Sequence, residues 1–157
     1  MNEYLKAHST PLDPNDIPHA LASLKPHELQ QPHSDLLKGI AHAQSPELIR
    51  ALVTVHGMDI DAATIESDSG RGYTLLWLGC HFGYPKIISA CLDLGADPMW
   101  RLTGGSPVWW ECYFGRHCGS VDIIDAMMLH PRSVDSIDTH ERHKGQMLHA
   151  IRCHTLR

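Results

Sequence analysis

The sequence has no excess of basic charge and no long hydrophobic run. Its 18 Asp and Glu residues outnumber its 13 Lys and Arg residues, for a net charge of −5, so it lacks the basic surface that nucleic-acid binding requires. No stretch approaches the roughly 18 apolar residues that cross a bilayer, and the N-terminal residues do not resemble a secretory signal. We therefore expect a cytoplasmic protein that binds neither nucleic acid nor membrane, with an acidic surface that favours a basic partner.

Common catalytic and disulfide patterns are also missing. The sequence contains no Gly-x-Ser-x-Gly turn, phosphate-binding loop, dinucleotide-binding glycine motif or His-Glu-x-x-His pair. We therefore expect no catalytic activity and no cofactor. The 5 cysteines are odd in number and irregularly spaced, which indicates reduced thiols.

What the sequence does contain is enough apolar material for one folded domain. Of its 157 residues, 43% are hydrophobic and only 20% are charged, as in folded globular proteins and unlike disordered chains. A chain of this length buries a substantial core. The question is how that core is built.

Residues 72–97 predict two helices joined by a tight turn. Thr74 is placed to cap the first helix, Gly83 to end it, and Pro85 to begin the second. Gly79 is small, as a residue must be where neighbouring helices approach closely. The segment therefore predicts one compact helix-turn-helix unit.

Parts of this unit recur along the chain. The apolar pair that begins at Ile87 recurs 39 residues upstream at Leu48 and 36 residues downstream at Ile123. A fixed period of about 33 residues is the mark of a repeat protein. The longer spacings here indicate two insertions, one at residues 63–70 and the other at 116–119.

The segment 72–97 resembles one ankyrin repeat. Gly72-Tyr73-Thr74-Leu75-Leu76-Trp77 resembles the family's Gly-x-Thr-Pro-Leu-His opening, Gly83 its glycine turn, Ile87-Ile88 its apolar pair, and residues 92–97 its Leu-x-x-Gly-Ala-Asp ending. The resemblance extends over about residues 34–153; Glu111 departs from it, because the family prefers Ala there. It implies an all-α solenoid of about three to four helix-turn-helix repeats at residues 34–157. Residues 1–33, rich in Pro and His, would form an N-terminal capping segment or a mobile arm.

The resemblance also implies non-catalytic protein binding through the concave face. The family's partner-facing positions fall on Arg71, Tyr73, His81, Phe82, Thr103, Trp110, Tyr113 and Phe114. Stacked repeats would place Phe82 beside Phe114 in an aromatic stripe, and aromatic residues are frequent binding anchors. The alternative is that these rings pack beneath the loop inserted at 116–119. An inhibitor, a toxin-neutralising immunity protein or a regulatory adaptor would all fit such a module.

Two other groups of residues admit a second interpretation. Trp77 and Trp109 replace a histidine of the family motif, and we expect both rings to stack between loops as structural residues. The 13 histidines allow a metal- or redox-responsive sensor that uses the His- and Cys-rich C-terminal third. The residues with metal-ligand spacing there are Cys112, His117, Cys118, His140, His143, His149 and Cys153.

Overall fold

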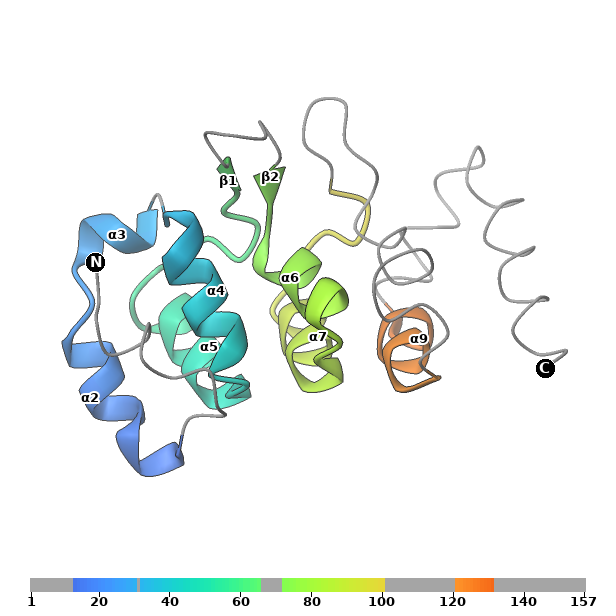
Figure 1. The fold of residues 1–157 in the computed structure, drawn as a ribbon, viewed down its shortest axis with the longest axis horizontal. Coiled ribbons are helices and arrows are strands. Elements are labelled where there is room, and N and C mark those ends of the chain that lie inside the picture. The colour runs from blue at the N-terminus through green and yellow to red at the C-terminus, as the bar shows by residue number, and fades with distance from the viewer. Residues whose placement is uncertain (1–12, 31, 66–71, 101–120, 132–157) are drawn as a thin grey trace, which may run out of the picture.

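Figure 1 shows a computed structural model that describes residues 13–30, 32–65, 72–100 and 121–131. Most of these residues are helical, which confirms the all-α prediction. The helices are η1 (Pro14–Asp16), α2 (Ile17–Ala22), α3 (Pro26–Gln30), α4 (Ser34–His42), α5 (Pro46–Thr54), α6 (Leu75–Phe82), α7 (Pro85–Asp93) and α9 (Val121–Met128). Two short strands, β1 (Thr64–Ile65) and β2 (Gly72–Tyr73), pair in an antiparallel arrangement.

The main helices lie in two layers. Helix α4 packs against α6 in one layer, while α5 packs against α7 and α7 against α9 in the other. Helices α6 and α7 also pack against each other, so they join the two layers. At the N-terminal end α2 contacts α5 (Figure 1). Side chains on the facing sides of the layers form the core.

The two helix pairs α4–α5 and α6–α7 are built alike, 39 residues apart. Gln44 and Gly83 occupy equivalent places in the turns, and both have positive φ, 48° and 75°. A proline then begins each second helix, Pro46 in α5 and Pro85 in α7. Because the turn and the helix start recur together, the spacing inferred from the apolar pairs describes a repeated structural unit.

Local capping explains where the helices begin and end. The Thr74 hydroxyl accepts a hydrogen bond from the Trp77 amide at 3.2 Å, and the Ser45 hydroxyl accepts one from the Leu48 amide at 3.1 Å. These caps satisfy amides that lack a partner within the helix. Gly83 ends α6 in the left-handed region, as predicted. Asp16 directly precedes α2, but its side chain makes no capping hydrogen bond, because η1 runs directly into this helix.

The recurring apolar pairs lie at the centre of the core. Leu48, Ile49, Ile87 and Ile88 are all 0% exposed, and Ile123 is 2% exposed. Gly79 allows α6 and α7 to approach closely, because a Cβ atom there would lie 3.2 Å from Ile88 Cγ1 and 3.5 Å from the Ile88 amide nitrogen. The prediction that Gly79 lies at a close helix contact is therefore confirmed.

The loops that follow successive helix pairs are tied to each other. The Asp61 carboxylate accepts from the Asp97 amide, with N–O distances of 3.0 and 3.2 Å. Left-handed glycines precede both aspartates, Gly57 with φ of 68° and Gly95 with φ of 98°. Among the described residues, no helix is both long and apolar enough to cross a bilayer. Glu111 and the insertion predicted at residues 116–119 lie outside the described ranges.

Candidate interaction surface

Three of the eight predicted contact residues fall within the described structure. They are Tyr73 in β2, and His81 and Phe82 at the end of α6. The other five lie outside the described ranges: Arg71, Thr103, Trp110, Tyr113 and Phe114. The expected neighbour of Phe82 in the following repeat, Phe114, is among them. The neighbours of His81 and Phe82 in the preceding helix pair lie within the described ranges.

Tyr73 is not a surface residue. Its side chain is only 4% exposed, with the Trp77 ring stacked on it at a centroid distance of 5.5 Å. The Lys38 ammonium nitrogen lies 5.4 Å from the centre of the Tyr73 ring. This burial argues against Tyr73 as a direct partner contact. The Tyr73 ring lies against Trp77 of the helix that follows β2 rather than pointing into solvent.

Tyr73 is the first member of a chain of aromatic rings along α6. The Trp77 ring stacks on His81 with centroids 4.6 Å apart and an interplanar angle of 12°. Positions 73, 77 and 81 are four residues apart, so they follow one side of the helix and the strand that leads into it. The expectation that Trp77 stacks as a structural residue fits these contacts, although its partners belong to its own repeat. Trp109 lies outside the described ranges.

The chain of rings continues across to the preceding helix pair. The Phe82 ring lies 5.2 Å from His81 and 4.5 Å from His42 of α4, measured between centroids. Tyr84 completes the group, with its ring 5.8 Å from Phe82 and its hydroxyl 2.9 Å from His42 Nδ1. We call these residues the ring cluster: His42, Tyr73, Trp77, His81, Phe82 and Tyr84.

Sequence reasoning missed two members of the ring cluster. His42 lies 39 residues before His81, so it occupies the same place in its own helix pair. The period that relates the apolar pairs therefore could have identified His42, had it been applied to polar positions as well. The same period could not have identified Tyr84, because the residue 39 positions before it is Ser45, a helix cap without an aromatic ring.

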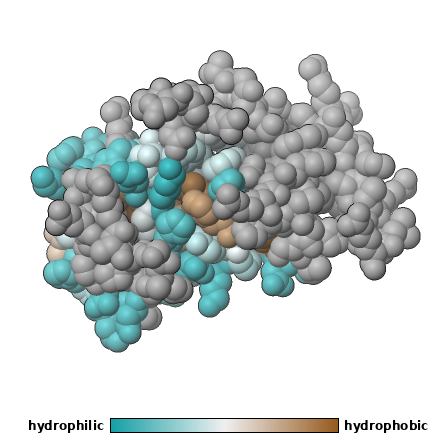
Figure 2. Space-filling model, viewed as in Figure 1, coloured by the Kyte–Doolittle hydropathy of each residue, from teal (hydrophilic) through white to brown (hydrophobic). Residues whose placement is uncertain are grey.

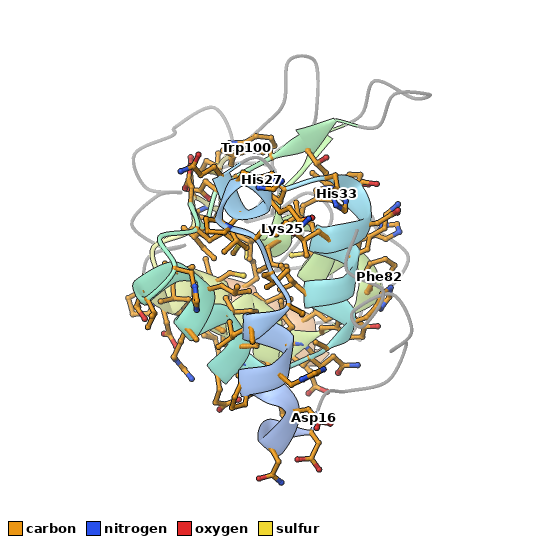
Figure 3. All side chains as sticks on the ribbon, turned by 90° about the vertical axis from the view of Figure 1, so that its left-hand side faces the viewer. Asp16, Lys25, His27, His33, Phe82 and Trp100 are labelled. Atoms are coloured by element: carbon orange, nitrogen blue, oxygen red, sulfur yellow. The ribbon has the colours of Figure 1, made fainter. Side chains whose placement is uncertain are left out.

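The ring cluster lies on the outer side of the layer formed by α4 and α6. All of its side chains except Tyr73 are partly exposed. Figure 3 shows Phe82 at the edge of the molecule, on the side of α4 and away from α5. On the face formed by α4 and α6, the described surface is largely hydrophilic around a small hydrophobic area (Figure 2). Partly exposed rings within a hydrophilic surface are typical of binding anchors.

This face is close to neutral, although the chain as a whole is acidic. Helix α6 carries no Asp, Glu, Lys or Arg, while α4 carries only Asp35 and Lys38. Partial burial, and then the nearby Lys38 charge, lower the pKa of His42 below its usual value. Partial burial likewise raises the pKa of Tyr84. Both shifts favour the uncharged forms of His42 and Tyr84, which lie on the same face as the Lys38 ammonium group.

The described residues contain neither a candidate metal site nor an exposed thiol. No group of three or more potential metal ligands occurs there. Cys80 and Cys91 are 1% and 0% exposed and pack in the core. Burial, with a smaller effect of the Asp61 charge, raises the pKa of the Cys91 thiol far above its usual value. Such a thiol stays protonated and unreactive. The residues of the metal- or redox-sensor alternative all lie outside the described ranges.

Comparison with known proteins finds no match: no family model, no curated protein and no solved structure resembles this chain significantly.

Proposed function

We propose that this chain is an ankyrin-like helical-repeat module that binds another protein without catalysing a reaction. The partner would bind the face formed by α4 and α6, where His42, His81 and Phe82 meet. The observation that carries this proposal is the ring cluster, in which five partly exposed rings from two successive helix pairs lie together. Large rings bury much apolar area at little cost in side-chain entropy, so they favour binding.

The repeated architecture supports the ankyrin-like part of the proposal. Successive helix pairs 39 residues apart share their turn geometry, their proline starts and their buried apolar pair. A hairpin precedes α6, and inter-loop hydrogen bonds tie one unit to the next. Repeat modules of this kind offer an extended surface made from equivalent positions of neighbouring units.

The biological role that we favour is that of an inhibitor, a toxin-neutralising immunity protein or a regulatory adaptor in the cytoplasm. The expectation of a basic partner rests on the net charge of −5. The near-neutral face formed by α4 and α6 does not support the expectation of a basic partner. We therefore propose that aromatic contacts contribute most of the binding free energy at this face.

The test is affinity capture from the native host, followed by calorimetry with the captured protein. We expect Phe82→Ala to weaken binding by about 2 kcal/mol, or roughly 30-fold, as for an interface anchor. The matched control is Val55→Ala, which removes an apolar side chain that is 75% exposed at the end of α5. Equal binding by the two variants would place the interface elsewhere. A large fall in the melting temperature of Phe82→Ala would make Phe82 a core residue instead.

A further inference from the structure

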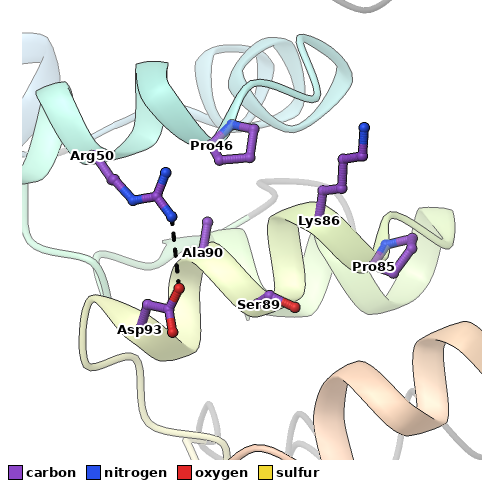
Figure 4. Close-up of a pocket in the computed structure, with 7 residues that line it drawn as sticks. All are labelled: Pro46, Arg50, Pro85, Lys86, Ser89, Ala90 and Asp93. Atoms are coloured by element: carbon purple, nitrogen blue, oxygen red, sulfur yellow. Dashed lines mark ion pairs between the residues drawn. The ribbon is translucent and has the colours of Figure 1, made fainter.

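A groove of about 310 Å³ lies between α5 and α7, in the layer opposite the ring cluster (Figure 4). Pro46 and Pro85, at the starts of the two helices, provide apolar walls. Arg50, Lys86 and Ser89 add polar groups along the same groove. Its volume is at the lower end of the range for small-ligand sites. It can therefore accommodate one or two side chains of another molecule.

The Arg50 guanidinium is oriented by carboxylates that leave its donors available. It lies 3.7 Å from the Asp93 carboxylate and 4.0 Å from that of Glu47. Both distances exceed the range of a hydrogen bond, so these contacts are ionic only. Asp93 is also shared, because His130 Nε2 lies 3.2 Å from its other oxygen. Arg50 thus keeps N–H groups that can donate to a ligand.

Two further donors in the groove have no partner in the described part of the chain. The Ser89 hydroxyl makes no hydrogen bond there, and Lys86 makes no ion pair. By contrast, the Thr54 hydroxyl donates to the Arg50 carbonyl at 2.8 Å, and the Ser23 hydroxyl, just after α2, donates to the Ala20 carbonyl at 2.6 Å. Since Ser89 is partly buried, its hydroxyl gains from a partner inside the groove.

The positive charges of the groove lie on long side chains with donors that can reach a negatively charged ligand. Arg50 and Lys86 line the groove together with one anion, Asp93, and the Glu47 carboxylate lies 4.0 Å from Arg50 without lining it. Helix α7 also begins beside the groove without a side-chain cap and without an acidic residue in its first turn, so no side chain of this helix start offsets the positive end of the helix dipole. A carboxylate placed among Arg50, Lys86 and Ser89 would receive charge-assisted hydrogen bonds from all three.

We propose that this groove binds the carboxylate of a Glu or Asp side chain from an acidic segment of a partner protein. The carboxylate accepts hydrogen bonds from Arg50, Lys86 and Ser89, and the aliphatic part of the ligand packs against Pro46 and Pro85. The groove lies between α5 and α7, whereas the partly exposed rings of the cluster lie on α4 and α6, except for Tyr84, which directly precedes Pro85. A chain that uses both surfaces can hold two protein segments at once, as an adaptor does.

The test is an NMR titration of the ¹⁵N-labelled full chain with an acetylated, amidated peptide rich in Glu. We expect saturable shifts of the Arg50, Lys86 and Ser89 amides, which weaken as salt is added. The same peptide with Gln in place of Glu should produce no such shifts. In the double variant Arg50→Gln, Lys86→Gln, the dissociation constant should rise at least about tenfold. Lys25→Gln, which changes an exposed lysine outside the groove, should leave it within about twofold.

Each result decides the proposal. Absence of saturable shifts, or equal binding of the Glu and Gln peptides, would overturn it. Inorganic phosphate serves as a second probe: shifts with phosphate and none with the Glu peptide would define a small-anion site and also refute peptide binding. Melting temperatures of all variants establish that they are folded. Because Phe82→Ala leaves the groove intact, it should bind the peptide normally, so the outcome does not depend on the ring cluster.

Discussion

The turns at Gln44 and Gly83 provide a paired test of the repeated unit. Both residues occupy the left-handed region, with φ of 48° and 75°, and both are followed two residues later by a proline that begins the next helix. Only glycine enters this region without steric cost; other residues lose about 1–2 kcal/mol there. Gln44 therefore carries a strain that Gly83 avoids at the equivalent position.

We expect Gln44→Gly to stabilise the protein. Relief of about 1–2 kcal/mol is partly offset by the greater chain entropy of glycine in the unfolded state, about 0.5–1 kcal/mol, which leaves a net gain of about 0.5–1 kcal/mol. For a chain of this size the melting temperature should rise by about 1–4 °C. The backbone hydrogen bond from the Gln44 amide to the Ala41 carbonyl, 3.1 Å long, does not involve the side chain and is retained.

The reciprocal variant, Gly83→Gln, should have the opposite effect. It introduces the same strain just after α6, partly offset by the lower entropy of the unfolded chain, so the free energy of unfolding should fall by about 0.5–1 kcal/mol. Urea and thermal unfolding followed by circular dichroism measure both changes. Gln44→Ala is the control, since it removes the side chain but keeps a Cβ atom in the left-handed region; we expect no gain in stability from it. If Gln44→Gly melts at or below the wild-type temperature, the strain argument is wrong.

Three further predictions concern His42, Gly79 and Asp61. The pKa of His42 is lower in the folded state than in the unfolded chain. Its contribution to stability is therefore present above the unfolded pKa of about 6.5 and is lost as the pH falls through the folded pKa. The melting temperature of the wild type should fall more between pH 7.5 and 5.5 than that of His42→Phe. Gly79→Leu should reduce the free energy of unfolding in urea by about 1–3 kcal/mol, because the leucine side chain would overlap Ile88. Gly79→Ala adds only a Cβ contact of 3.2 Å and should stay within about 1 kcal/mol of the wild type. Equal losses in the two variants would contradict close packing as the cause. Asp61→Ala should cost about 1–2 kcal/mol in the same assay by removing the acceptor of the Asp97 amide, and that amide should exchange with D₂O faster; unchanged exchange would mean that the inter-loop bond contributes little.

Much of the fold follows from local signals. Thr74, Gly83 and Pro85 act within a few residues of themselves, through a capping hydrogen bond, a left-handed turn and a fixed φ, so their effect can be predicted from neighbouring residues alone. Apolar periodicity is equally local, and it identified the buried pairs that begin at Leu48 and Ile87. Local signals do not act alone: Asp16 is a residue type that often caps helices, yet it makes no capping hydrogen bond to α2, because η1 runs directly into this helix.

The candidate site depended far more on tertiary structure. His42 and Phe82 are 40 positions apart, and their rings meet only because α4 packs beside α6. Tyrosine is a residue type that often anchors an interface, yet the Tyr73 ring stacks against Trp77, and the Lys38 ammonium nitrogen lies 5.4 Å from the ring centre. The groove with Arg50 and Lys86 likewise has no sequence pattern, because it exists only between two neighbouring helices.

The sequence by itself determined where the helices begin and end, which faces of them are apolar, and the spacing at which the unit repeats. These properties arise from hydrogen bonds and torsion angles within a single turn or helix. Only the tertiary structure decided which rings stay exposed, which donors lack a partner and which charges lie together. Those properties depend on distances between helices that are remote in the chain, and the packing of the core sets these distances.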